Sequence, residues 1–425
     1  MKQRACLVLL IVSILVLFGA NTLLAKDIHV LSQFPLSGPL GAYPEMGWGY
    51  IDAWNWFNEE QGGVGGQKVK YHLEDFRYNP TVEIMNFNKY CSQYGRDEFL
   101  MATGYITDAL KPLIEKVNVE EKIPYASGSM SEELFGKGGG PSKFPYYYSM
   151  GTPYGDQIKV LVKWIIDNHK GKGRPKLAFV NSPRAYGRDG RAEGLAYAKE
   201  KGVEIVTEIE YPYSATDATN ECMEIRKGKA QYVIFHGYVG AMSASAVFLK
   251  TARKIIPKAQ ILGTNYMGGR IPFPVNGLAY DGFILACCWP AMDAFPRSST
   301  PMVNPMVKMI HDFAKKNRPE EYKKGLKGGI RDMQTYFQSA LHAFVQQKAL
   351  VQAHAAGDLS RGGVKKALDN LVWDFHGMYG GKKFSYALHH IPMVRLFRAN
   401  VKVKPSLTGS WTPVSDWINT QEIKW

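Results

Sequence analysis

The sequence has few cysteines for its length. Five are present in 425 residues, and none of the spacings is the C-x-x-C of a zinc or redox motif. A chain this long can form a core without disulfide bonds. The adjacent pair Cys287 and Cys288 lies in the apolar stretch "GFILACCW", which favours two small buried side chains. The disulfide state of Cys91, Cys222, Cys287 and Cys288 is left open by the sequence.

Familiar catalytic and metal-binding patterns are missing as well. H-E-x-x-H, G-x-S-x-G and the Walker phosphate loop do not occur. His389 and His390 are adjacent, and neighbouring side chains on a strand point apart, which disfavours a shared metal ion. The sequence therefore predicts a protein that is not an enzyme and has no cofactor or resident metal. An exported hydrolase using Ser127, Ser129 or Ser131 is an unfavoured alternative, because no partner base can be identified.

The positive charge is not concentrated in one segment. The formal net charge is +14, but the lysines and arginines are scattered or occur in short pairs such as Lys315–Lys316. A nucleic-acid-binding protein normally has a localised basic patch. We therefore expect no nucleic-acid partner.

Long apolar runs are confined to the N-terminus. Lys2 and Arg4 precede an apolar run over residues 7–18, and small residues follow up to Ala25. This order is typical of a secretory signal peptide, with cleavage near Ala25. Cys6 precedes the apolar run, so a lipid-anchored form is disfavoured. We expect residues 1–25 to be removed and the mature chain to be periplasmic; an uncleaved anchor is the alternative.

A glycine-rich stretch, "NEEQGGVGGQKVKYHLED", could in principle hold a phosphate. A phosphate loop follows a strand and opens a helix, whereas here a helix-like pattern comes before the glycines and a strand-like pattern after them. Glycine accepts the positive φ found at the ends of helices. The stretch is therefore predicted to be a turn from a helix into a strand.

Strand-like and helix-like patterns alternate along most of the chain, which indicates parallel sheets covered by helices. Two such series predict an α/β fold with two doubly wound parallel-sheet lobes, joined by a hinge that the chain crosses several times. A hinge of this kind implies a cleft between the lobes. The expected division is a signal peptide over 1–25, an N-terminal lobe over 26–151 plus 285–380, and a C-terminal lobe over 152–284 plus 381–425.

Ligands of open parallel sheets bind beyond the carboxyl ends of the strands. The loops expected there include "PLSGPLGAY", "GYIT", "SGSMSEE", "SPRAYG", "HGYVGA" and "GTNYMGG". They are rich in Ser, Thr, Tyr and Asn and have few charges. This composition favours a small polar or zwitterionic ligand that is held by hydrogen bonds and enclosed by aromatic rings.

The segment from "PLSGPLGAY" through "NEEQGGVGG" to "NPTVEIMNFNKYC" resembles the start of the Leu/Ile/Val-binding protein family. "YGRDG", "YVIFHGY" and "ILGTNY" follow in the expected order, so the resemblance covers nearly all of the mature chain. It implies a type I periplasmic binding protein that serves an ABC importer as a monomer, with permease and ATPase subunits as partners. A receptor with the same fold that feeds a signalling system is the alternative.

The resemblance also implies ligand-binding residues. Tyr43 would cover the apolar part of the ligand, and Thr107 would donate to its carboxylate. Ser129 and Ser131 would hold an amino-acid-like head group. In the second lobe, Tyr238 is the expected aromatic contact, and Tyr186 is expected at the edge of the cleft.

One position departs from the amino-acid binders of this family. They have an acidic residue after the strand ending "ILGT", where it pairs with the ammonium group of the ligand, and this chain has Asn265. A neutral amide cannot provide that counter-charge, and a buried ammonium without one is costly. Either another acid such as Asp108 replaces it, or the ligand lacks an α-amine. Amides, keto acids and aromatic carboxylates then become candidates, and the ligand stays unidentified.

Overall fold

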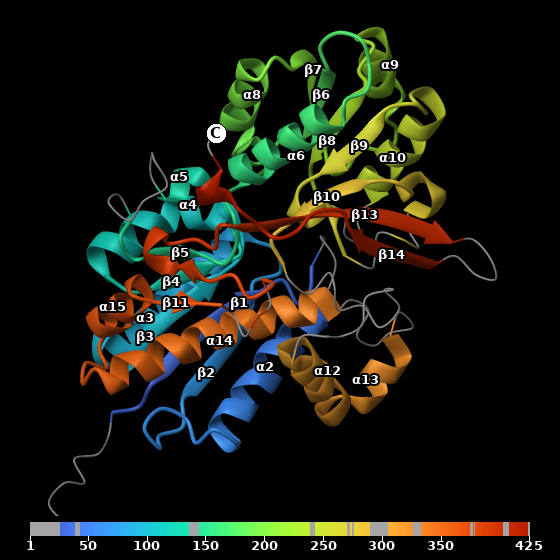
Figure 1. The fold of residues 1–425 in the computed structure, drawn as a ribbon. Coiled ribbons are helices and arrows are strands. Elements are labelled where there is room, and N and C mark those ends of the chain that lie inside the picture. The colour runs from blue at the N-terminus through green and yellow to red at the C-terminus, as the bar shows by residue number, and fades with distance from the viewer. Residues whose placement is uncertain are drawn as a thin grey trace, which may run out of the picture.

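The computed structural model describes most of the chain after the N-terminus. The described residues are 26–38, 43–135, 144–238, 243–269, 273, 276–289, 305–325, 333–374, 377, 379–402 and 408–423. The expected signal peptide and its cleavage site lie outside them. Two bodies, each built around its own sheet, lie side by side and are joined at the centre (Figure 1).

The first lobe is built on a five-stranded parallel sheet in the order β2-β1-β3-β4-β5. β1 and β3 are buried along their whole length, as expected of central parallel strands. The strands are β1 (His29–Phe34), β2 (Lys70–Asp75), β3 (Phe99–Gly104), β4 (Tyr125–Ser127) and β5 (Tyr147–Ser149).

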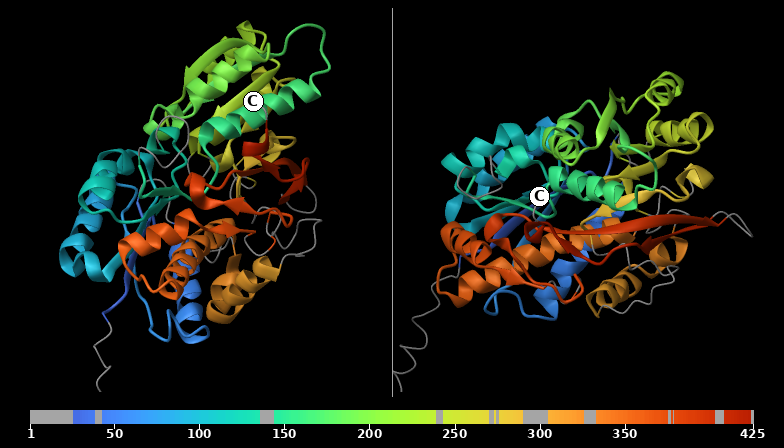
Figure 2. Two further views of the ribbon diagram at one scale, coloured as in Figure 1. Left: turned by 60° about the vertical axis from the view of Figure 1, so that its left-hand side comes forward. Right: turned by 45° about the horizontal axis from the view of Figure 1, so that its top comes forward.

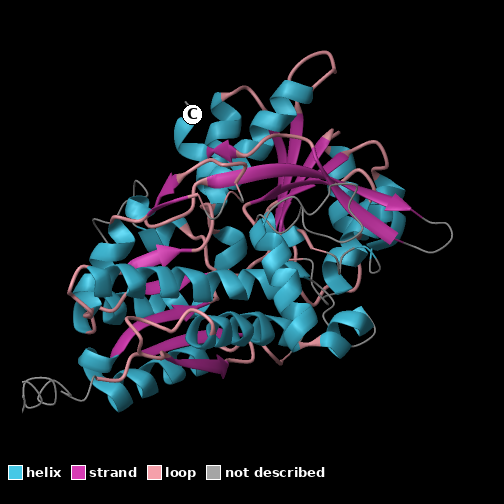
Figure 3. Cartoon of the chain, turned by 60° about the horizontal axis from the view of Figure 1, so that its bottom comes forward, coloured by secondary structure: helices cyan, strands magenta, loops and turns pink. Residues whose placement is uncertain are grey.

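Helices cover both faces of this sheet (Figure 3). Proline stands in the first turn of both α2 and α3, and the Asn79 side chain accepts the Thr81 N–H to cap α3. The helices from the first part of the chain are α2 (Pro44–Glu59), α3 (Pro80–Glu98), α4 (Thr107–Glu115), the π-helix η1 (Lys116–Glu120) and α5 (Glu132–Phe135). Those contributed by the later part are α12 (Pro305–Asn317), α13 (Pro319–Lys324), α14 (Met333–Ala355) and α15 (Arg361–Asp369).

The second lobe has an eight-stranded mixed sheet. Its main path is β14-β13-β10-β9-β8-β6-β7, with β15 paired to β13. β6 to β10 are parallel, whereas β13 and β14 add an antiparallel edge that the sequence patterns did not predict. The strands are β6 (Lys176–Asn181), β7 (Glu204–Glu210), β8 (Tyr232–His236), β9 (Gln260–Gly263), β10 (Ile284–Cys287), β13 (Met393–Lys402), β14 (Thr408–Pro413) and β15 (Ile418–Asn419).

Helices pack on this second sheet as well, and short segments complete the two lobes. The helices are α6 (Tyr154–Asn168), α7 (Ala185–Arg188), α8 (Arg191–Glu200), α9 (Thr219–Lys227) and α10 (Ser243–Ile255). The remaining segments are η2 (Asn265–Met267), η3 (Gly277–Tyr280), the two-stranded pair β11 (Val372–Trp373) and β12 (Phe384–Ser385), η6 (Tyr386–Leu388) and η7 (Thr420–Glu422).

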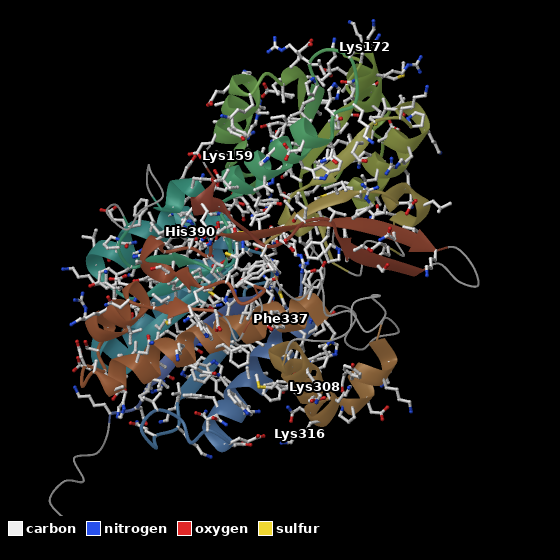
Figure 4. The ribbon with its side chains drawn as sticks, viewed as in Figure 1. Lys159, Lys172, Lys308, Lys316, Phe337 and His390 are labelled. Atoms are coloured by element: carbon white, nitrogen blue, oxygen red, sulfur yellow. The ribbon has the colours of Figure 1, made fainter. Side chains whose placement is uncertain are left out.

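The chain passes between the lobes after β5, between β10 and α12, and after η6. The first and third crossings can be followed in Figure 2. The first and third crossings are bonded to each other. Ser149 N donates to His389 O at 2.7 Å, and Thr152 Oγ1 donates to Ile391 O at 2.7 Å. His390, in the third crossing, lies where the two lobes meet (Figure 4).

The pairings of β10 and β12 differ from the predicted lobe boundaries. β10 pairs with β9 and β13, so residues 285–287 belong to the second sheet and not to the first lobe. β12 pairs with β11 before the last crossing, so residue 381 is too early a start for the final segment of the second lobe. An apolar strand such as "FILAC" does not reveal which sheet it joins, because hydrogen-bond partners are chosen in three dimensions. The boundaries elsewhere stay a prediction.

The glycine-rich stretch is a turn between α2 and β2, as predicted. Gly62, Gly63, Gly65 and Gly66 all have positive φ, from +58° to +89°. A Cβ on Gly63 would lie 2.1 Å from the Gln67 carbonyl oxygen, so a larger residue does not fit there. These glycines shape the path of the chain from α2 into β2.

Cys91, Cys222, Cys287 and Cys288 are free thiols, and all four are buried. Among the described residues, no helix has both the length and the apolar content that a membrane span requires.

The first lobe depends on close packing between α2 and α14, which come from distant parts of the chain. Tyr50 of α2 donates its hydroxyl to Gln346 of α14 at 2.9 Å, and both side chains are buried. A Cβ on Gly49 would lie 2.0 Å from the Tyr336 carbonyl oxygen, which is nearer than atoms can approach. The absence of a side chain at Gly49 is therefore what lets the two helices touch.

Gly49→Ala should lower the stability of the protein by about 2 kcal/mol, because α2 and α14 must separate to admit the methyl group. Thermal or urea unfolding measures the effect. Gly362→Ala, in the exposed part of α15, is the matched control. Its new Cβ would meet only Ser360 Oγ, at 3.6 Å, so stability should stay the same or rise. Equal melting temperatures for the two variants would contradict the role given to Gly49.

Candidate functional site

A cavity lies where loops from both sheets meet, beyond the carboxyl ends of their strands. Its volume is about 30 Å³, enough for water but far below the several hundred Å³ that is typical of pockets for organic ligands, roughly 300–1,000 Å³. Six tyrosines dominate its wall. The lining residues are Tyr78, Tyr105, Ile106, Thr107, Tyr154, Tyr186, Tyr238 and Tyr266. An organic solute could enter only if the lobes or these side chains move apart.

The first-lobe wall is formed mainly by the turn from β3 into α4. Tyr105, Ile106 and Thr107 follow β3 directly, and Thr107 is the first residue of α4. Thr107 Oγ1 lies 2.6 Å from Ser129 Oγ. One hydrogen lies between these two oxygens, so the pair has a second O–H that can donate elsewhere. The N-terminus of a helix also favours negative charge, so this wall suits an anionic group.

Tyr78 reaches the cavity from an unusual turn after β2. Arg77 and Tyr78 both have φ of +53°, a left-handed conformation that is rare for residues with side chains. The Asp75 carboxylate secures the turn by accepting the N–H groups of Leu36 at 3.0 Å and Arg77 at 2.9 Å. A strained backbone thus brings a phenol ring to the site, as strained turns at binding sites do.

In the second lobe, Tyr186 is held from both ends. Its hydroxyl donates to Gly237 O at 2.7 Å, and its carbonyl oxygen lies 2.9 Å from His236 Nε2. Burial lowers the pKa of His236 to about 4, so the ring is neutral at physiological pH. Because a carbonyl can only accept, Nε2 carries the hydrogen, and Nδ1 accepts from Thr264 Oγ1 at 2.7 Å. Tyr186 therefore presents a fixed ring to the cavity, with its hydroxyl already engaged.

Tyr266 joins the two walls. Its hydroxyl donates to Gly128 O of the first lobe, and its ring lies 6.1 Å from Tyr105 and 5.6 Å from Tyr186. A second polar contact between the lobes pairs Lys111 Nζ of α4 with Asp189 Oδ1, at 3.2 Å. These contacts describe a closed conformation.

The lining side chains carry no charge. Burial raises the pKa of all six tyrosines above the usual value, so every phenol keeps its proton at neutral pH. No carboxylate belongs to the described residues that line the cavity. The described lining residues can therefore offer ring faces and hydroxyl donors, but none of them supplies a counter-charge for an ammonium group. Asp108, the replacement acid considered from the sequence, is not part of this lining but lies close enough to raise the pKa of Tyr78.

Three of the predicted ligand-binding residues line the cavity, namely Thr107, Tyr186 and Tyr238. Two more lie directly behind them. Ser129 is hydrogen-bonded to Thr107. Tyr43 lies close enough to Tyr238 to interact with it electrostatically, and after burial this interaction is the largest cause of the raised pKa of Tyr238. Contact with a ligand stays a prediction for all five.

The other two predicted residues lie further from the lining. Ser131 is fully buried near Asp189, whose pKa is raised mainly by burial. Asn265 faces the second crossing of the hinge. Its Oδ1 accepts the Cys288 N–H at 3.1 Å, and its own N–H donates to Gln157 Oε1 at 2.9 Å. Asn265 is thus held by Gln157 of α6 and by Cys288 at the second crossing, and whether it contacts a ligand stays a prediction.

Sequence reasoning missed four of the tyrosines in the wall: Tyr78, Tyr105, Tyr154 and Tyr266. Each follows a strand within five residues, in "FRYNP", "GYIT", "GTPYG" and "GTNYM". Tyr78 and Tyr105 stand in loops, whereas Tyr154 begins α6 and Tyr266 lies in η2. Tyr105 and Tyr266 stand within two residues of predicted residues. The repeated tyrosine after a strand was the available signal.

A larger recess of about 340 Å³ lies elsewhere, between α2 and α12. Lys308 and Lys316 line it (Figure 4). Both lysines pair with neighbouring carboxylates, Lys308 with Asp312 at 2.6 Å and Lys316 with Glu60 at 2.8 Å. Its charges are thus matched within the protein, and the tyrosine-lined cavity remains the better candidate.

A family model described as periplasmic binding protein matches residues 28–404. The chain belongs to the periplasmic binding protein family. A comparison with curated protein sequences gives no significant match. The family assignment agrees with the two lobes, the hinge and the cavity between them.

Solved structures resemble this periplasmic binding protein over almost the whole chain. A branched-chain amino acid ABC transporter protein from Thermus thermophilus, with bound valine, has a TM-score of 0.72 at 21% identity and covers 93% of this chain and 97% of its own. A fatty acid ABC transporter substrate-binding protein from Thermomonospora curvata has a TM-score of 0.72 at 18% identity, with 94% of each chain covered. A solute-binding protein from Rhodopseudomonas palustris, in complex with p-hydroxybenzoic acid, has a TM-score of 0.70 at 17% identity and covers 93% and 98%. At these identities the likeness concerns the fold.

Tyr266→Phe should shift this binding protein toward an open form, because it removes the hydroxyl that donates across the cleft. The loss of one such hydrogen bond is worth about 1 kcal/mol, or roughly a fivefold change in the open-to-closed ratio. Small-angle X-ray scattering of the ligand-free protein should give a larger radius of gyration.

Tyr211→Phe is the control for this measurement. Its hydroxyl also donates to a backbone carbonyl, that of Asp217 at 3.2 Å, but both residues belong to the second lobe. The radius of gyration should not change. A Tyr266→Phe protein as compact as the control would show that the bond does not hold the lobes together.

Proposed function

We propose that the protein is the solute-binding receptor of an ABC importer. It captures one small molecule between its lobes in the periplasm and delivers it to a membrane permease driven by an ATPase. It acts as a monomer and does not transform the ligand. Membership of the periplasmic binding protein family and the interlobe cavity support this role.

The proposed ligand is a small carboxylate with an aromatic or similarly flat apolar body and no ammonium group. The observation that carries this choice is the lining of the cavity, with six tyrosines and no acidic side chain among the described residues. Tyrosine rings pack well against flat apolar surfaces. An amino acid would bury its ammonium without a counter-charge, which is costly.

Thr107 and the N-terminus of α4 are proposed to receive the carboxylate. The Thr107–Ser129 pair has an O–H to spare, and the helix end favours an anion. The tyrosines would then enclose the body of the ligand, with Tyr186 and Tyr266 acting through their rings because their hydroxyls are bonded to backbone carbonyls.

Binding requires opening and closure, because the cavity of about 30 Å³ is smaller than any such ligand. A ligand that contacts both walls binds the closed form better than the open form and thereby shifts the population toward it. This shift is the signal that a permease could recognise. Among the similar structures, one holds valine and one holds p-hydroxybenzoic acid. The uncharged tyrosine lining supports an aromatic carboxylate such as p-hydroxybenzoic acid over an amino acid such as valine.

Isothermal titration calorimetry with benzoate, 4-hydroxybenzoate, 2-oxoisovalerate, benzamide and L-valine tests the ligand class. We expect at least one aromatic carboxylate to bind at micromolar concentration or below, and L-valine to bind at least a hundredfold more weakly. Tight binding of L-valine would refute the proposed ligand class but not the receptor role. No binding by any solute in a broad panel would count against the receptor role itself.

Thr107→Val tests where the carboxylate binds. The variant keeps the size of the side chain and removes its hydroxyl, so we expect roughly tenfold weaker binding of benzoate, the cost of one hydrogen bond to a charged group. Thr219→Val, at the exposed start of α9, is the control and should bind as the wild type does. Unchanged affinity for the Thr107 variant would place the carboxylate elsewhere.

A further inference from the structure

Glu83 is a buried carboxyl group directly behind the cavity. It lies in the first turn of α3 and is 0% exposed. Its Oε1 accepts the Tyr105 N–H at 3.0 Å and the Tyr125 hydroxyl at 3.3 Å. The nearby Ile106 N–H also lowers the pKa of this carboxyl group, against the larger effect of burial. Glu83 thus binds the backbone of Tyr105, whose side chain lines the cavity.

The carboxyl group fits tightly against this turn. A Cβ on Gly104 would lie 2.2 Å from Glu83 Oε1, so only glycine leaves room for the contact at the end of β3. The side chain of Gln33, from β1, donates to the Glu83 carbonyl oxygen at 3.1 Å and so lies beside it. Glu83 is therefore built into the lobe as a support for the segment Tyr105–Thr107.

Nothing in its described surroundings neutralises a negative charge on Glu83. The titratable groups that face it are the phenols of Tyr125 and Tyr147, and burial raises the pKa of both far above neutral pH. Glu83 Oε2 and Gln33 Oε1 are buried acceptors without a hydrogen-bond partner among the described residues. A proton on Oε2 would turn one of these two buried acceptors into a donor. Burial raises the pKa of Glu83 to about 8, so the neutral form prevails at pH 7.

We propose that Glu83 is a positioning residue for the cavity, whose neutral carboxyl group holds the segment Tyr105–Thr107 in the ligand-binding conformation. Losing the proton weakens the binding of an anionic solute. The second statement rests on the proposed function, whereas the first concerns the ligand-free protein.

Ionisation of Glu83 should weaken the binding of an anionic ligand, because the two groups then carry charges of the same sign. A ligand carboxylate at Thr107 lies two residues from the N–H that Glu83 accepts, in a buried region where charges are poorly screened. The bound anion therefore raises the pKa of Glu83 further, and by linkage the ligand binds better when Glu83 is protonated. A rise of one unit corresponds to a tenfold change in affinity. Binding should thus be strongest below pH 8 and weaken as the pH rises above it.

The test is calorimetry with benzoate from pH 6.5 to 9.5 on the wild type, Glu83→Gln and Glu83→Ala. Benzoate is chosen because it does not titrate in this range. Wild-type affinity should fall about tenfold across the range. Glu83→Gln keeps an acceptor but no charge, so it should bind within threefold of the wild type at pH 6.5 and show no such fall. Glu83→Ala should bind more weakly at every pH.

Glu98→Gln, at the far end of the same helix, is the matched control and should keep the wild-type pH profile. Glu132 also titrates near pH 8, since burial raises its pKa to about 8, but it is unchanged in all these proteins. A wild-type profile equal to that of Glu83→Gln overturns the coupling. So does a Glu83→Gln profile that still falls tenfold.

Hydrogen exchange of the ligand-free proteins tests positioning independently of any ligand. The Tyr105 and Ile106 amides of the wild type should lose protection by about tenfold or more, relative to Glu83→Gln, between pH 6.5 and 9.5, because opening the turn hydrates the ionised carboxylate. Equal protection in both proteins at all pH values overturns the role of Glu83. If benzoate fails to bind while the exchange result holds, the proposed ligand class is wrong and the positioning role stands.

Discussion

The structure depends on one geometric constraint, which is that two parallel sheets point their carboxyl ends at a shared hinge. Parallel strands end on the same edge, so the loops after β3, β6, β8 and β9 converge on one small volume. The three crossings join the two lobes at this edge. This convergence brings together in the cavity wall loop residues that are far apart in sequence.

Tyrosine side chains determine the chemical character of the cavity wall. Tyr186 and Tyr266 use their hydroxyls on backbone carbonyls, so their rings are fixed before any ligand arrives. Such preorganisation reduces the entropy lost on binding. Because the phenols stay neutral, the proposed choice of ligand rests on shape, ring contacts and the lack of an acidic side chain among the described lining residues. The bond from Tyr266 to Gly128 spans the two lobes, so one side chain both lines the cavity and joins the lobes.

Buried ionisable groups stand behind the lining on both sides. His236 holds Tyr186 in the second lobe, and Glu83 holds Tyr105 in the first. Both are fully buried and are neutral at physiological pH. A neutral titratable group can donate and accept in the same place, which suits a support that must satisfy mixed backbone partners. The consequence is that the uncharged cavity is surrounded by groups whose neutrality depends on pH.

The sequence by itself determined the two α/β lobes, the turn at Gly62–Gly66 and the loops that carry Thr107, Tyr186 and Tyr238, because strand and helix periodicity and the positive φ of glycine are local properties. It could not assign β10 and the antiparallel β13 to a sheet. Nor could it reveal that Asn265 accepts a hydrogen bond from the Cys288 N–H, or that Glu83 accepts one from the Tyr105 N–H. These features are contacts between segments that periodicity treats as independent. Only the tertiary structure decided them, because hydrogen-bond partners and burial depend on which distant residues meet.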